Sequence, residues 1–128
     1  MIVITITPIK AELIDFSVKE ETAEMQVTFR DESDEHVFSI KNRVADTEEL
    51  AEKVVLEMRK IVKKFHTPET DQYEEILAIR VHDEETVIKR LKLFFDKVKE
   101  KIKEVRMTKS ANGYLDTLSR AKKLELYF

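Results

Sequence analysis

The sequence has no cysteine and a single glycine, Gly113, in 128 residues. The missing cysteine excludes disulfides, thiolate catalysis and cysteine-based zinc sites. The scarcity of glycine argues against phosphate-binding loops, dinucleotide fingerprints and nucleophile elbows, because each needs a positive φ or a close approach of the backbone to its ligand. The sequence therefore predicts no cofactor and offers no recognisable catalytic motif.

Charged residues are in excess. Asp, Glu, Lys and Arg make up 38% of the chain, against about 25% in an average globular protein. The apolar fraction of 42% is ordinary and is enough for a folded core. Glutamate and lysine dominate the charged set, and Asn and Gln together number only 4. This composition is typical of proteins from hyperthermophiles, so we expect a heat-stable single domain over residues 1–128.

No segment has the pattern of a membrane span or a targeting signal. The N-terminal run Met1–Pro8 lacks basic residues and is too short to cross a bilayer. Its apolar residues alternate with others, which is typical of a β-strand. We therefore expect a cytoplasmic protein without a membrane partner.

The first 45 residues predict a meander of four antiparallel strands. Apolar and β-branched residues recur at every second position in four short runs, which is the pattern of half-buried strands. Polar breaks separate the runs and imply short turns, the first of them at residues 8–10. The expected core-facing residues are Ile2, Ile4 and Ile6; Ile14, Phe16 and Val18; Met25, Val27 and Phe29; and His36, Phe38 and Ile40.

Two later segments predict amphipathic helices. Residues 46–66 begin with a capping pair, Asp46 and Glu49, and residues 83–111 begin with Asp83 and end before Gly113. A further strand over residues 75–82 lies between them. The expected apolar stripes are Leu50, Ala51, Val54, Val55, Met58, Ile61, Val62 and Phe65 on the first helix, and Val87, Ile88, Leu91, Phe94, Phe95, Val98, Ile102 and Val105 on the second.

The predicted fold class is α+β, with the order β-β-β-β-α-β-α and room for a short C-terminal strand in a docked tail, residues 112–128. Its sheet is mostly antiparallel, and both amphipathic helices pack on one face. The opposite face is mostly polar, and its few apolar residues form either a modest exposed patch or positions covered at the edges. This face is expected to carry Val3, Thr5, Thr7, Leu13, Ser17, Gln26, Thr28, Val37, Ser39, Ile76, Ala78 and Arg80.

Charge is divided unevenly along the chain. Residues 1–85 hold 11 basic and 21 acidic residues, whereas residues 86–128 hold 12 basic and 5 acidic residues. A basic second half is compatible with phosphate binding, and this nucleic-acid alternative would use Arg90, Lys97, Lys101, Arg106, Lys109, Arg120, Lys122 and Lys123. An acidic ridge on the outermost side of the second helix, Asp96, Glu100 and Glu104, favours instead the contact of these cations with acids of the same molecule.

Two sets of polar residues are candidate sites. The acidic cluster Asp31, Glu32, Asp34 and Glu35 lacks the glycine and the ligand spacing of a calcium loop, which indicates a solvated hairpin tip. The three histidines lie far apart in the sequence, with no pair at helical spacing, so no metal site or catalytic histidine is predicted. His36 shares the parity of core residues, which indicates a strand-end histidine with a hydrogen-bond partner.

Six apolar residues form the predicted interface. Leu56 and Leu93 lie on the outward sides of the two helices, and the tail ends in Leu124, Leu126, Tyr127 and Phe128. The favoured hypothesis is a non-catalytic interaction or structural module that forms a homo-oligomer, with a dimer as the expected state. The alternatives are a nucleic-acid-binding accessory protein, and a ligand binder or enzyme with a pocket between the sheet and the helices.

Overall fold

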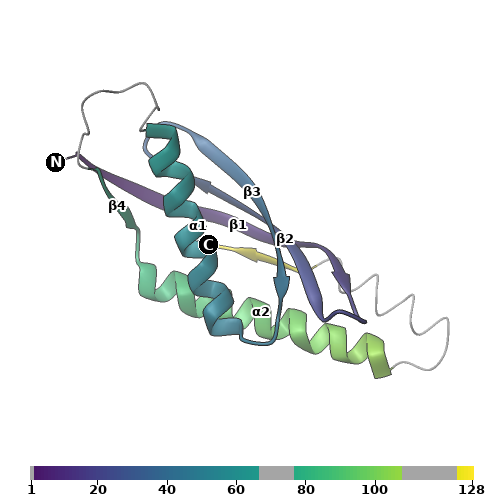
Figure 1. Ribbon diagram of the computed structural model, residues 1–128. Helices are drawn as coiled ribbons and strands as arrows, with labels where there is room; N and C mark the ends of the chain where they lie inside the picture. The colour runs from purple at the N-terminus through teal and green to yellow at the C-terminus, as the bar shows by residue number, and fades with distance from the viewer. Residues whose placement is uncertain (1, 67–76, 108–123) are drawn as a thin grey trace.

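The computed structural model describes residues 2–66, 77–107 and 124–128. It confirms an α+β fold in which one mixed sheet packs against two helices (Figure 1). Residues 67–76 and 108–123 lie outside this description, and with them the predicted start of the strand at residues 75–82, the predicted end of the helix at residues 83–111 and most of the predicted tail, residues 112–128. The elements are β1 (Ile2–Ser17), β2 (Thr22–Arg30), β3 (Glu35–Arg43), α1 (Thr47–His66), β4 (Leu77–Val81), α2 (Glu84–Met107) and β5 (Glu125–Tyr127).

The first two predicted strands are one long strand. β1 runs without a turn through Pro8, where a break was expected. Its register with β2 shifts twice, between Pro8 and Lys10 and between Leu13 and Asp15, so Ile9 and Ile14 are each an extra, bulged residue. A proline lacks the N–H that a ladder requires, and a bulge is one of the few places in a sheet that tolerates it.

The bulges also reverse the expected faces of β1. Each inserted residue moves the residues after it to the opposite face, because side chains alternate along a strand. Leu13 is therefore buried in the core, although it was expected on the polar face. Ile14 is exposed and Val18 lies in the following turn, although both were expected to face the core. Phe16, after the second bulge, packs against the core as expected.

β1 organises the sheet because every pairing except β2 with β3 involves it. The strand order is β3-β2-β1-β4, and β5 also pairs with β1. β4 lies parallel to residues 2–6 of β1, and β5 lies antiparallel to residues 10–12. β2 pairs with β1 only from Thr7 onward, on the other edge. The N-terminal part of β1 thus has a partner strand on one edge only among the described strands.

The two helices cover the same face of the sheet (Figure 1). The Asp46 carboxylate accepts the Glu49 N–H at 3.0 Å, which is the predicted N-terminal cap of α1. At the joint between the helices, the Thr47 hydroxyl donates to Asp96 at 2.6 Å, and Arg59 donates to Glu84 at 2.6 Å. The buried residues of both helices belong to the predicted stripes, except that Thr47 is added.

Phe65 was expected in the core but is 54% exposed. It is the last apolar residue of α1, beyond the end of the shared core, and it packs against two histidine rings instead.

Among the described residues, neither helix has the length and apolar character that a membrane span requires.

Candidate functional site

The acidic turn between β2 and β3 is not a wholly solvated tip. Glu32, Asp34 and Glu35 are exposed as expected, but Asp31 is only 6% exposed. Its Oδ1 accepts the backbone N–H groups of Ser33 and Asp34, each at 2.7 Å. Its own N–H donates to the Asp34 carbonyl at 2.9 Å. The prediction for Asp31 was wrong because this carboxylate folds back on its own turn, as Asp side chains in turns often do.

Two histidines from distant parts of the chain meet the other oxygen of Asp31. The Oδ2 atom lies 2.9 Å from Nε2 of His36, on β3, and 3.1 Å from Nε2 of His66, at the end of α1. The Phe29 ring stacks on the His36 ring at a centroid distance of 5.1 Å. Phe65 lies edge-on to both histidines. We call Asp31, His36 and His66 the Asp31 cluster; it ties the end of α1 to the turn.

Hydrogen bonds set the charge of Asp31. Burial alone would raise the pKa of its carboxyl, but the bonds from the Asp34 N–H, His36, the Ser33 N–H and His66 lower the pKa well below its ordinary value of 3.8. The carboxylate therefore stays ionised in the folded protein throughout the physiological pH range. A buried carboxylate with this many donors stabilises the fold.

The lowered pKa of Asp31 predicts a defined pH dependence of stability. A carboxyl whose pKa is lowered by folding stabilises the protein above its ordinary pKa and loses that contribution as the pH falls. Wild type should have a higher free energy of unfolding than Asp31→Asn near pH 7. We expect this difference to decrease as the pH falls from about 5 to about 2.5. Urea unfolding of both proteins across this range measures it. A constant difference would contradict the role assigned to the ionised carboxylate.

The geometry of the Asp31 cluster fits a role in stabilising the fold better than a role in catalysis or metal binding. Both carboxylate oxygens already accept hydrogen bonds, and the two histidines share one of them. Within the described ranges, no group of three or more His, Asp or Glu side chains is arranged to hold a metal ion. Sequence reasoning missed the cluster because Asp31 and His66 are 35 positions apart. The parity of His36 was the one signal: it predicted a hydrogen-bond partner without naming it, and the structure shows that this partner is Asp31.

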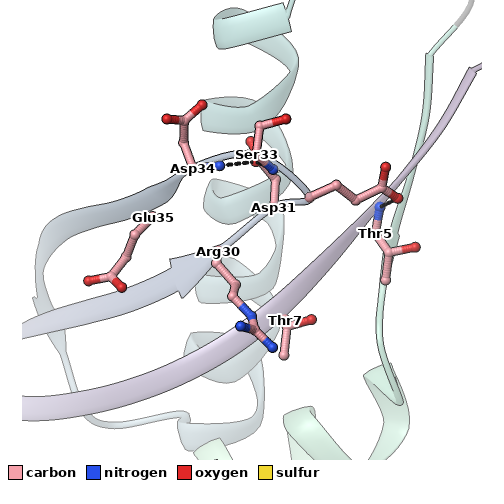
Figure 2. Close-up of a pocket in the computed structure, with 8 residues that line it drawn as sticks. Thr5, Thr7, Arg30, Asp31, Ser33, Asp34 and Glu35 are labelled. Carbon is pink, nitrogen blue, oxygen red and sulfur yellow. Dashed lines mark hydrogen bonds between the residues drawn. The ribbon is translucent and has the colours of Figure 1, made fainter.

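Beside the same turn lies an open, polar hollow of about 440 Å³. Figure 2 shows Thr5 and Thr7 of β1 on one side of it and the turn residues Ser33 and Asp34 on the other. Arg30 contributes the single basic side chain of the lining. The hollow is found where β2 turns away from β1 while β1 continues.

A second surface lies between α2 and β5. Leu93 is 60% exposed there. It borders a groove of about 200 Å³ whose lining is Arg90, Leu93, Phe94, Lys97, Glu125 and Leu126. Of the predicted interface residues, this α2–β5 groove joins Leu93 and Leu126. Leu56 is exposed on α1 and lines no part of the groove.

The end of the tail pairs within the molecule. Leu124, Leu126 and Phe128 pack against the core, and Tyr127 is exposed on the other side of β5. Arg90 donates to the Tyr127 carbonyl at 2.7 Å and lies 5.6 Å from the centre of the Phe128 ring. β5 and α2 therefore hold each other in place.

Basic residues proposed for nucleic-acid binding largely contact their own molecule. Arg106 donates to Glu21 at 2.6 Å and to the Val18 carbonyl at 2.9 Å, and it lowers the pKa of Glu21. Lys101 pairs with Glu104 at 3.1 Å. Lys97 lines the α2–β5 groove, as does Arg90. The remaining residues of that set, Lys109, Arg120, Lys122 and Lys123, lie outside the described residues.

No family model, curated protein or solved structure matches this chain.

Proposed function

We propose that this protein is a small, heat-stable, non-catalytic interaction module that associates with a second copy of itself through the α2–β5 groove. The observation that carries the proposal is Leu93, a large apolar side chain 60% exposed beside that groove. Exposed apolar residues at a depression are typical of interfaces. In a two-fold dimer, Leu93 of each protomer would enter the groove of the other.

The lining of the groove supports this pairing. Its apolar residues, Leu93, Phe94 and Leu126, lie among two cations, Arg90 and Lys97, and one anion, Glu125. Because both signs of charge are present, a second copy can be oriented with opposite charges facing each other. The composition supports heat stability, since an excess of Glu and Lys favours networks of ion pairs.

The use of the polar groups supports a non-catalytic role. Asp31 is the most deeply buried charged residue among those described, and both oxygens of its carboxylate accept hydrogen bonds from within the fold. Arg106 holds the β1–β2 turn to α2 through the Val18 carbonyl and the Glu21 carboxylate. These groups are occupied in the folded chain and are not presented to a substrate.

Substituting Leu93→Glu tests the proposed interface. A charge in the centre of an apolar contact is expected to raise the dimer dissociation constant at least about tenfold. Leu56→Glu makes the same change at an exposed leucine on the other helix, outside the groove, and is expected to leave the dissociation constant within about twofold. Sedimentation equilibrium measures both constants. Equal weakening by the two substitutions would place the interface elsewhere.

A further inference from the structure

Among the strands that the structure describes, none pairs with one edge of the first residues of β1. Ile6 accepts the His82 N–H through its carbonyl at 2.9 Å, so the even-numbered residues direct their backbone groups toward β4. Val3 and Thr5 therefore direct theirs to the other side, because these groups alternate along a strand. β2 does not reach this side, since its pairing with β1 begins at Thr7.

One side chain occupies part of this edge. Glu32, in the turn after β2, accepts the Thr5 N–H through Oε1 at 3.3 Å. A carboxylate oxygen thus stands where the carbonyl of a neighbouring strand would be. The contact is long and exposed, so an incoming strand can replace it at little cost.

Apart from Glu32, the described residues give this edge none of the protection that sheet edges usually carry. Edge strands are commonly guarded by charged side chains, and β3 has Glu35, Lys41 and Arg43. On β1, Ile2 and Val3 are 47% and 46% exposed, and residues 2–6 include no charged side chain. An apolar, unguarded edge is a template for another strand.

The hollow beside the edge favours a basic partner. Its exposed acids are Glu32, Asp34 and Glu35, and the single cation of its lining is Arg30. The part of the chain that contains it, residues 1–85, has 21 acidic and 11 basic residues. A second copy docked by the same edge would bring two acidic regions together, whereas a basic segment is attracted to the hollow.

We propose that the edge of β1 at Val3–Thr5 binds an extended, lysine- or arginine-bearing segment of another protein. The segment adds to the sheet between the start of β1 and the β2–β3 turn. Its backbone bonds to Val3 and Thr5, Glu32 releases the Thr5 N–H, and its basic side chains meet Glu32, Asp34 and Glu35. The site is separate from the α2–β5 groove, so it does not depend on self-association.

The probe is a fluorescent acetylated peptide amide of alternating lysine and valine, five residues long. We expect saturable binding by fluorescence anisotropy, and binding weaker by at least about tenfold when Glu replaces every Lys. Val3→Pro removes one N–H at the edge and is expected to weaken binding about tenfold, whereas Val3→Thr keeps that N–H and the affinity. N-methylation of the peptide backbone removes N–H donors from the peptide and is also expected to weaken binding about tenfold. This test does not depend on whether Val3→Pro folds.

The outcomes separate this proposal from self-association. Unchanged affinity for Leu93→Glu supports an independent site. The absence of saturation up to about 1 mM peptide would overturn the proposal, as would equal binding of the N-methylated or the acidic peptide. A dimer that Val3→Pro converts to a monomer would show that a second copy, not a basic segment, occupies the edge.

Discussion

Replacing Asp31 with alanine should lower the free energy of unfolding by about 3 kcal/mol. The substitution removes a buried carboxylate that accepts two backbone N–H groups at 2.7 Å and two histidine rings at 2.9 and 3.1 Å. These donors lie in a partly buried region, where polar groups that lose a partner are costly. The link between α1 and the β2–β3 turn is lost at the same time. Urea unfolding measures the change, and a melting temperature lower by roughly 10 °C should accompany it.

Asp34→Ala is the matched control for this prediction. Asp34 lies in the same turn and is exposed. Its contacts with Asp31 are made by its backbone N–H and carbonyl, which alanine retains. We expect a loss below about 0.5 kcal/mol. Comparable losses for both substitutions would show that the turn, and not the Asp31 carboxylate, accounts for the effect.

Deleting residues 124–128 should destabilise the protein by about 3 kcal/mol, because it removes three apolar side chains that pack against the core. The main chain loses the bonds between Leu124 and Leu13 and between Phe128 and Ile9, both 3.0 Å. Arg90 loses its carbonyl partner as well. Differential scanning calorimetry of the shortened chain measures the change.

Tyr127→Ala serves as the control for the deletion. Tyr127 is exposed on the side of β5 away from the core, and alanine keeps the strand and its backbone bonds. We expect a loss below about 1 kcal/mol. If the shortened chain melted at the wild-type temperature, β5 would contribute nothing to the fold, and the α2–β5 groove would have no fixed wall.

The fold class was predictable because the spacing of apolar residues is regular within each helix and within each strand after β1. Leu50 to Val62 and Val87 to Val105 carry the 3.6-residue spacing without interruption, and both stripes lie in the core. β1 was not predictable in the same way. Alternation identifies a face only while the ladder is regular, and the inserted residues Ile9 and Ile14 move the faces twice.

The polar sites were predictable only in part. The uneven charge of the two halves indicated contacts within the molecule, and Arg106 with Glu21 is such a contact. The contact between Asp31 and His66 depends on the packing of α1, which brings His66 to the turn. The sequence also does not show that the start of β1 extends beyond the end of β2, since that depends on the register of their pairing. The Asp31 cluster and the exposed edge of β1 could therefore not be predicted, because they depend on helix placement and on strand register.

The most direct test of self-association is sedimentation equilibrium of the wild-type chain over concentrations up to about 500 µM. The account predicts a mass that rises with concentration toward twice that of the chain, and a lower mass for Leu93→Glu at the same concentration. A wild-type mass equal to one chain at every concentration would contradict it.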